Sequence, residues 1–266
     1  MAVLGAISST SNPQAKYTRS LHTRRVRYRE ERYILEGHRL VAQALQLQGG
    51  FASVFFTADY AAEPPGERLV AELARGATPM WQVTPQVLAH MADTETPQGI
   101  LAVAPIPPPD RAAARGVSLA VLLDSLRDPG NLGTILRTCV ATGVDSVLLS
   151  TGCVDAYAPK VVRAGMGAHF ALRILPNLAW PEIEELVAGK RCVLTDVRGE
   201  ESPWRLDWTV PTVLIVGSEA HGAGPEAQAL ADVRVRLPMD EDAESLNAAI
   251  ATAVFLFEAY RQRHEA

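Results

Sequence analysis

From residue 117 onward, short apolar runs alternate with stretches of helical periodicity, and this alternation constrains the fold more than any other feature of the chain. Parallel strands need crossover connections, which are usually helices. The pattern therefore predicts an α/β fold with a parallel sheet covered by helices on both faces. The expected strands are residues 118–126, 146–150, 171–177, 191–197, 212–218 and 233–239. The expected helices are residues 133–143, 160–170, 180–189, 225–231 and 245–263.

The residues before 117 predict a second, smaller α/β unit, because a chain of 266 residues exceeds what one hydrophobic core usually supports. The helices expected in this unit are residues 14–25, 33–50, 67–76 and 85–93, and the expected strands are residues 51–58, 78–84 and 99–106. A proline-rich and then charged segment follows, which is typical of a linker. We therefore expect a domain at 1–106, a linker at 107–116 and a second domain at 117–266.

Three loops of the second region carry more polar residues and glycines than a turn needs. In parallel sheets, ligands bind at the carboxyl ends of the strands, where these loops are expected. In the first loop, Asn131 and Arg137 follow a Pro-Gly turn. The second loop, residues 216–227, has three glycines that permit close backbone approach, and the third, residues 237–247, enters a nearly uncharged helix. Taken singly, each loop is also compatible with a plain connection between a strand and a helix. In that case Arg137 would be solvated and Ser245 would only cap its helix.

The chain lacks the nucleotide-binding glycine motifs that such a sheet often carries. Neither G-x-G-x-x-G nor the phosphate-binding G-x-x-x-x-G-K-[ST] occurs in the sequence. A nicotinamide-dependent oxidoreductase is therefore disfavoured.

The charge of the chain is distributed unevenly. Residues 1–39 carry eight basic and three acidic residues, a net charge of +5, whereas the whole chain carries −5. Three tyrosines that could stack on bases lie in the same segment. We interpret this segment as a contact site for a polyanion such as RNA, and the alternative is a solvated, salt-bridged helix. The residues expected to contact RNA are Lys16, Arg19, Arg24, Arg25, Arg27 and Arg29.

The cysteines and the start of the chain indicate a compartment. Cys139, Cys153 and Cys192 are odd in number and widely spaced in apolar surroundings, so we interpret them as buried thiols. The first residues lack the basic start and apolar stretch of a signal peptide, and no apolar run has membrane-spanning length. The expected location is the cytoplasm.

Taken together, the three loops resemble a known family. Asn131–x5–Arg137, the run IVGSEAHG and the pattern LPM–x5–SLN resemble the three motifs of the SpoU (TrmH-like) family of RNA ribose 2′-O-methyltransferases, in the SPOUT superfamily. Residues 155–170 are similar to a further conserved block of that family, and residues 12–45 to the substrate-binding domain of its ribosomal-RNA members. Many relatives place a glycine near Glu241, where this chain departs from the pattern.

The resemblance implies a fold, a cofactor and an assembly. The implied fold is a SPOUT α/β domain with a deep trefoil knot around residues 212–260, preceded by a smaller α/β substrate-binding domain that resembles a ribosomal protein. Chains rarely thread loops, so periodicity alone would not predict the knot. The implied cofactor is S-adenosylmethionine in a bent shape, held largely by backbone groups, and the implied assembly is a homodimer that completes each site with residues from both subunits. The matching cofactor positions are Thr195, Gly217, Leu237, Met239, Ser245, Leu246 and Asn247.

The resemblance also implies a reaction that needs no metal, in which a ribose 2′-hydroxyl attacks the methyl group of the cofactor. The implied catalytic residues are Asn131, Arg137, Glu219, Ser245 and Asn247. A guanidinium stays protonated, so we expect Arg137 to grip the phosphate beside the target ribose rather than act as a base, with Asn131 orienting Arg137 or the ribose. The expected substrate is ribosomal RNA of the large subunit. The alternatives are a tRNA 2′-O-methyltransferase of the same family and a catalytically silent RNA-binding protein.

Overall fold

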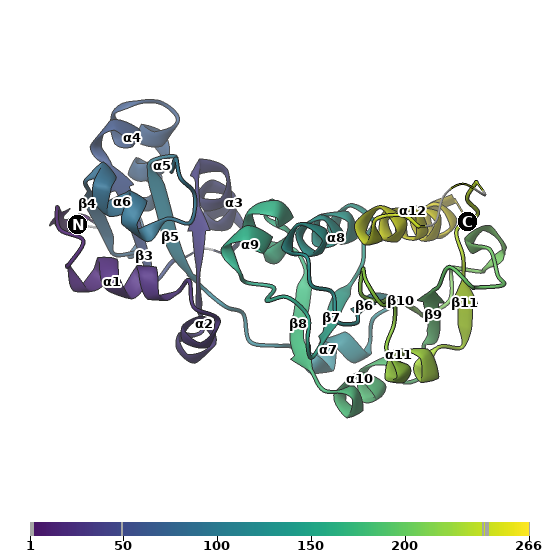
Figure 1. Ribbon diagram of the computed structural model, residues 1–266. Helices are drawn as coiled ribbons and strands as arrows, with labels where there is room; N and C mark the ends of the chain where they lie inside the picture. The colour runs from purple at the N-terminus through teal and green to yellow at the C-terminus, as the bar shows by residue number, and fades with distance from the viewer. Residues whose placement is uncertain (1–2, 49, 241, 243–244, 266) are drawn as a thin grey trace. The chain divides into compact units, whose positions relative to one another are not determined.

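The computed structural model describes residues 3–48, 50–240, 242 and 245–265. The chain forms two compact units, each with its own sheet (Figure 1). The first unit contains residues up to Pro108 together with Tyr157–Phe170, and the second contains Pro109–Ala156 and Ala171–Ala266.

The second unit is built on a six-stranded sheet in which every neighbouring pair is parallel. Its strand order is β11-β9-β10-β6-β7-β8. The strands are β6 (Leu119–Leu123), β7 (Ser146–Ser150), β8 (Arg173–Leu178), β9 (Arg191–Thr195), β10 (Thr212–Val216) and β11 (Val233–Val235). Every residue of β6, β7 and β10 is buried, as expected where helices cover both faces of a parallel sheet. The predicted α/β fold is confirmed.

The helices of the second unit lie on both faces of this sheet. Figure 1 shows α8 and α12 on one face and α7, α10 and α11 on the other. Their bounds are α7 (Arg111–Arg115), α8 (Pro129–Ala141), α10 (Trp180–Val187), α11 (Pro225–Leu230) and α12 (Ala248–Glu265), and a short 3₁₀ helix, η2, spans Pro203–Arg205. Helix α8 begins at Pro129, earlier than the expected start at residue 133, so the Pro-Gly pair belongs to the first turn of the helix and not to a separate turn. Asp128 caps the helix by accepting the Asn131 backbone N–H at 2.7 Å.

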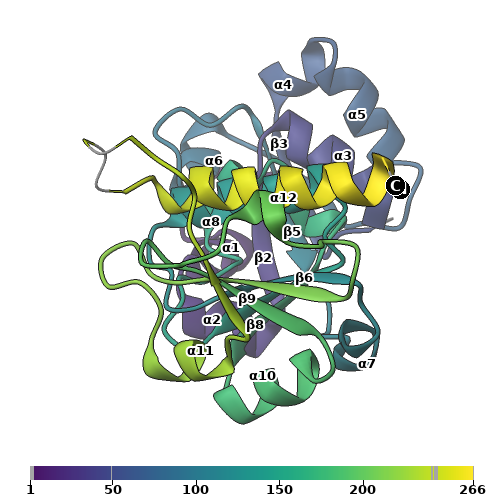
Figure 2. The same cartoon turned by 90° about the vertical axis from the view of Figure 1, so that its right-hand side faces the viewer.

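The carboxyl-terminal helix α12 is anchored at its far end and packs beside α8 (Figure 2). Gln262 donates its side-chain amide to the Leu206 carbonyl at 3.0 Å and accepts the Trp208 backbone N–H at 2.9 Å. Arg263 donates to the Val210 carbonyl at 2.8 Å. Trp208 itself is fully buried. These bonds fix the carboxyl-terminal end of α12 against the segment that follows η2.

The first unit is a mixed five-stranded sheet with the order β1-β4-β3-β5-β2. Strands β1, β4 and β3 are parallel, and β5 is antiparallel to both β3 and β2. The strands are β1 (Val3–Ile7), β2 (Arg32–Glu36), β3 (Ser53–Thr57), β4 (Met80–Val83) and β5 (Ile100–Pro105). The helices are α1 (Pro13–Ser20), α2 (Arg24–Glu30), α3 (His38–Gln48), α4 (Ala58–Ala62), α5 (Gly66–Leu73), α6 (Pro85–Met91), α9 (Pro159–Gly165) and the 3₁₀ helix η1 (Ala168–Phe170).

The first unit corrects several sequence-based expectations. The helix expected over 33–50 begins only at His38, because Arg32–Glu36 pairs with β5 as a strand and Gly37, with φ +96°, turns the chain into the helix. The helix expected over 14–25 is two helices, α1 and α2. Val3–Ile7 forms an edge strand that the sequence did not indicate. The helix expected over 160–170 ends at Gly165, because Met166 takes the left-handed conformation.

Two further expectations concern the knot and membrane-spanning helices. The region expected to be knotted includes Glu241 and residues 243 and 244, which lie outside the described residues, so the knot stays a prediction. In the part of the chain that the structure describes, no helix is long and apolar enough to cross a bilayer.

Candidate active site

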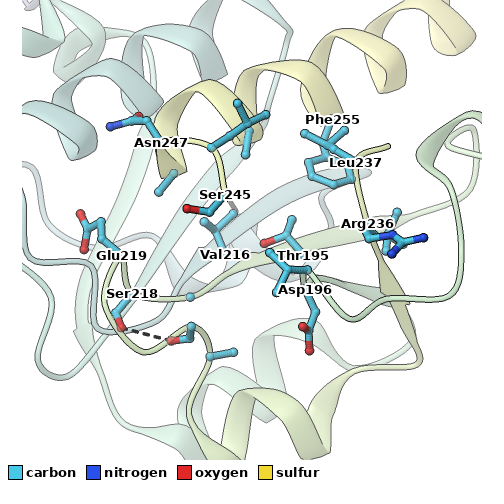
Figure 3. Close-up of a pocket in the computed structure, with 18 of the residues that line it drawn as sticks. Thr195, Asp196, Val216, Ser218, Glu219, Arg236, Leu237, Ser245, Asn247 and Phe255 are labelled. Carbon is cyan, nitrogen blue, oxygen red and sulfur yellow. Dashed lines mark hydrogen bonds between the residues drawn. The ribbon is translucent and has the colours of Figure 1, made fainter. Parts of the chain in front are cut away.

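A cavity of about 1020 Å³ opens at the carboxyl edge of the parallel sheet in the second unit (Figure 3). It is bounded by the loops that follow β9, β10 and β11 and by the first turns of α8 and α12. All three motifs seen in the sequence reach it. This is the edge at which ligands bind in parallel sheets, as the sequence predicted.

A chain of side-chain hydrogen bonds connects the three motifs at one end of the cavity. Asn131, on α8, donates its amide to the Glu219 carboxylate at 2.9 Å. The Asn131 carbonyl oxygen accepts the side-chain amide of Asn247 at 2.9 Å. Asn247 in turn caps α12 by accepting the backbone N–H of Ala249 at 2.9 Å. Asn131 is therefore held by the second and third motifs, and within the described residues it makes no hydrogen bond to Arg137.

Glu219 has an ionised carboxylate surrounded by hydrogen-bond donors. Besides the Asn131 amide, it accepts the backbone N–H groups of Arg127 at 3.3 Å and Asp128 at 3.2 Å. Burial alone would raise the pKa of Glu219, but these hydrogen bonds outweigh it and hold the pKa below the ordinary value. The carboxylate thus joins the loop after β10 to the start of α8.

The loop after β10 turns back on itself at the cavity wall. Ser218 and Gly222 exchange two backbone hydrogen bonds, at 2.8 and 2.9 Å. Gly217 lies so close to this turn that a Cβ there would meet the Ala223 nitrogen at 2.2 Å. Only glycine fits this position, so the glycine pattern of the second motif has a direct geometric cause.

The residues expected to contact the cofactor all line the cavity. They come from the ends of β9, β10 and β11 and from the segment before α12, and they are Thr195, Gly217, Leu237, Met239, Ser245, Leu246 and Asn247. Thr195 is fixed by donating its hydroxyl to the Ile215 carbonyl at 3.2 Å. Among the expected catalytic residues, Asn131, Glu219, Ser245 and Asn247 also line the cavity. The structure therefore places these four residues at the cavity, and their catalytic roles stay predictions.

Arg137 is placed differently from the other expected catalytic residues. It lies on the exposed side of α8, does not line the cavity of its own chain, and makes no ion pair or hydrogen bond through its side chain with any described residue. Its guanidinium is therefore available to a molecule outside this chain.

The basic segment of the first unit is only partly available for RNA. Lys16 and Arg25 are exposed and have no side-chain partner among the described residues. Arg19 donates to the His90 carbonyl at 2.5 Å, Arg24 lies over the Tyr28 ring at 5.8 Å, and Arg29 pairs with Glu30 at 2.8 Å.

Arg27 is a correction to the expected RNA contacts. Its side chain is only 3% exposed and donates to the Leu21 carbonyl at 2.6 Å. It therefore stabilises the turn between α1 and α2 instead of presenting its charge to solvent.

Several residues of the cavity wall belong to none of the three motifs. Asp196 follows Thr195 at the end of β9 and forms ion pairs with Arg198 at 3.5 Å and Arg234 at 3.6 Å. Arg198 and Arg236 also line the cavity. In Figure 3 Arg236 lies at the far side of the cavity from Glu219. Asp196 and Arg236 lie inside the expected strands 191–197 and 233–239, and only Arg198 directly follows one, where loops meet the carboxyl edge of the sheet.

Fold and site define a class: an α/β protein that holds a ligand at the carboxyl edge of a parallel sheet, in a cavity made by three motif loops. Residues 118–257 match the model of the SpoU rRNA Methylase family, and residues 3–102 match the MRM3-like substrate binding domain. The chain belongs to the SpoU rRNA methylase family.

Several curated proteins are similar along most of the chain. An uncharacterized tRNA/rRNA methyltransferase of Synechocystis is 35% identical over 264 residues, covering 98% of this chain and 95% of the relative. The 23S rRNA (guanosine(2553)-2′-O)-methyltransferase RlmP of Bacillus subtilis is 32% identical, covering 94% and 97%. The mitochondrial rRNA methyltransferase 3 of Mus musculus is 31% identical, covering 90% of this chain and 70% of the relative.

Solved structures extend the similarity to both units. An AdoMet-bound rRNA methyltransferase from Sinorhizobium meliloti superposes with a TM-score of 0.84 at 29% identity, covering 98% of each chain. The SpoU methyltransferase AviRb from Streptomyces viridochromogenes, in complex with AdoMet, superposes with a TM-score of 0.86 at 28% identity, covering 95% of this chain and 98% of that one.

Proposed function

We propose that the protein transfers a methyl group from S-adenosylmethionine to a ribose 2′-hydroxyl in ribosomal RNA. The observation that carries the proposal is the hydrogen-bonded chain Glu219–Asn131–Asn247, which joins the three family motifs at the edge of one cavity. The activities named for the relatives from Bacillus subtilis and mouse support the same reaction and substrate.

The residues of the cavity fit S-adenosylmethionine. Its volume of about 1020 Å³ is large enough for a nucleoside-sized ligand. Leu237, Met239 and Leu246 supply apolar wall, and the loop around Gly217 brings backbone groups close to the ligand space. When bound, the cofactor supplies a methyl group activated on a sulfonium.

Positioning is the main task that this chemistry leaves to the protein. Because the methyl group would arrive already activated, the protein would contribute mainly by aligning the ribose oxygen with that methyl group. Asn131, Glu219 and Asn247 keep the motif loops in register. We assign Arg137 to the RNA, where its planar guanidinium grips the phosphate beside the target ribose in a bidentate contact.

The first unit supports RNA as the substrate. Its match to a substrate binding domain and its exposed Lys16 and Arg25 fit a surface that contacts the RNA backbone. Because ribosomal RNA is the proposed substrate, we place the reaction in the cytoplasm.

We propose that the protein works as a homodimer through the second unit. Helix α12 leaves Ile250 and Phe257 exposed seven residues apart, which puts them on one stripe of the helix, and Leu246, in the segment before the helix, is also exposed. Ile250 is 56% and Phe257 54% exposed, and a stripe of large apolar side chains is typical of an interaction surface. Val140 is exposed on the adjacent α8. Because Arg137 lies outside the cavity of its own chain, a dimer through this face would let it serve the cavity of the partner.

The decisive experiment separates cofactor binding from methyl transfer. Arg137→Ala should abolish methylation of ribosomal RNA while the Kd for S-adenosylmethionine stays within about twofold of wild type. Arg137→Lys should not restore activity, because a point charge cannot reproduce the planar fork. Arg115→Ala, which removes an exposed arginine of the same unit, is the matched control and should be fully active. Substantial activity in Arg137→Ala would exclude the assigned role, and the absence of any S-adenosylmethionine binding to the wild type would exclude the proposed function.

A further inference from the structure

One buried carboxylate beside the cavity is not explained by the reaction. Asp124 follows β6, is 4% exposed, and does not line the cavity. A buried carboxylate is costly unless hydrogen bonds satisfy it, so its partners indicate its role.

The partners of Asp124 come from three different elements. Its Oδ2 accepts the backbone N–H of Gly224 at 2.7 Å, and its Oδ1 accepts the hydroxyls of Ser150 at 3.0 Å and Ser125 at 3.2 Å. Its own backbone N–H donates to the Val216 carbonyl at 2.9 Å. One side chain thus connects the ends of β6 and β7 to the loop that follows β10.

The bond to Gly224 fixes one end of the cavity-lining loop. Residues 217–224 leave β10 and make the turn between Ser218 and Gly222. Glu219 ties the outer part of the loop to α8, and Asp124 ties its return end to the sheet. Hydrogen bonds to charged groups are stronger than neutral ones, so this contact is a firm attachment point.

We propose that Asp124 is a positioning residue for the methyl donor: through the Gly224 amide it holds the 217–224 loop in the conformation that forms the cofactor wall. The inference rests on the proposed function for the identity of the donor, but not for the attachment of the loop. Asp124 touches neither donor nor RNA in this assignment. Its loss is expected to weaken donor binding and leave RNA binding unchanged.

The test compares variants of the whole 266-residue chain at Asp124 with one at Asp145. Asp145 also accepts backbone N–H groups, those of Ser118 and Leu119 at 2.9 Å, but at the opposite end of β6. Asp124→Ala should raise the Kd for S-adenosylmethionine at least about tenfold at a temperature where the variant is folded, with the Kd for RNA unchanged. Asp145→Ala should lower the Tm with an unchanged Kd for the donor.

A conservative variant separates hydrogen bonding from charge. Asp124→Asn keeps an oxygen for the Gly224 N–H and turns its amide toward the Ser150 oxygen, so donor affinity should return to within about threefold of wild type. If Asp124→Ala does not fold, Asp124→Ser replaces it, because its hydroxyl is too short to reach Gly224. A wild-type donor Kd in the folded Ala or Ser variant, or an equal loss in Asp145→Ala, would overturn the proposal.

Amide hydrogen exchange supplies a readout that needs no donor. The Gly224 amide should be protected in the wild type and in Asp145→Ala, and should exchange faster in Asp124→Ala. If the wild-type protein bound no S-adenosylmethionine, the proposed function would fail, while the exchange rate would still decide whether Asp124 holds the loop. Unchanged protection of Gly224 in Asp124→Ala would refute the attachment.

Discussion

The side-chain amide nitrogen of Asn247 lies 2.9 Å from the side-chain oxygen of Asn131, although 116 residues separate them in the chain. The side-chain nitrogen of Asn131 donates a hydrogen bond to the Glu219 carboxylate. The side-chain oxygen of Asn131 is therefore used as an acceptor and its side-chain nitrogen as a donor. A residue with this pair of partners cannot be replaced by one with two donors or two acceptors without loss.

Asn131→Asp should be more damaging than Asn131→Ala. The aspartate would face the Glu219 carboxylate across a distance that is now a 2.9 Å hydrogen bond, and like charges at that distance repel. We expect a loss of about 1–3 kcal/mol in the free energy of unfolding and methyl transfer near background. Thermal denaturation and methyl incorporation into ribosomal RNA measure the two effects. Equal activity in the Asp and Ala variants would contradict the predicted repulsion.

The lowered pKa of Glu219 predicts that the free energy of unfolding decreases at acidic pH. Its pKa is held below the ordinary value of 4.5, so the folded state binds this proton less readily than the unfolded state does. The stabilisation is therefore present above pH 4.5 and is lost as the pH falls through the lower, folded-state pKa. Glu219→Gln lacks this titration, so the difference in unfolding free energy between wild type and variant should shrink from about pH 6 to about pH 3. A difference independent of pH would contradict the prediction.

Gly217→Ala should abolish donor binding with little effect on the rest of the fold. The added Cβ would lie 2.2 Å from the Ala223 nitrogen, so the loop around Ser218–Gly222 must open. We expect at least a tenfold rise in the Kd for S-adenosylmethionine, measured by isothermal titration calorimetry. Gly116→Ala is the matched control, because its nearest contact would be 3.9 Å away, and it should bind the donor normally. Normal binding by Gly217→Ala would show that the loop tolerates this opening.

The strands and helices of the second unit could be predicted because the patterns that mark them are local in the sequence. Runs such as Val213–Val216 are apolar throughout and are buried on both faces. What the sequence missed depends on distant partners. Strand β2 is a strand because it pairs with β5, about seventy residues later, and its own periodicity extends smoothly into α3.

The same reason accounts for the errors among the site residues. Arg27 belongs to a basic run, but its burial depends on the turn at Leu21. Asp124 stands in an apolar run that reads as plain strand, and its importance depends on Gly224, one hundred residues later. The bonds of Asn131 to Glu219 and Asn247 likewise join motifs that only the fold brings together. In these cases the sequence shows which residues are polar or charged, but it does not show which distant residues they bond to.

The proposed dimer makes a prediction that mixing two inactive variants can test. Arg137→Ala keeps the donor cavity, and Gly217→Ala keeps the arginine. If Arg137 acts in the cavity of the partner, mixed dimers contain one complete site, and random exchange should restore about a quarter of the wild-type activity. If Arg137 acts within its own chain, the mixture stays inactive.

The surface of the proposed dimer has its own test. Phe257→Glu should shift the protein from dimer to monomer in analytical ultracentrifugation, because it places a charge in the exposed apolar stripe of α12. Leu47→Glu changes a similarly exposed side chain of the first unit and is the control, which should stay dimeric. A monomeric wild-type protein would exclude the dimer.

The basic segment predicts a change in the salt dependence of RNA binding. Lys16 and Arg25 are exposed and unpaired among the described residues, so they are the members of this segment best placed to neutralise phosphates. Replacing both with Gln should weaken RNA binding and flatten the slope of log affinity against log salt by up to about 1.4 to 1.8. Filter binding at several salt concentrations measures the slope. The matched control replaces Arg68 and Arg75, which are exposed on and just after α5, and should leave the slope unchanged if the contact is local. Equal slopes for wild type and the Lys16/Arg25 variant would show that the segment is a solvated face, whereas equal flattening by both double variants would indicate a diffuse effect of net charge.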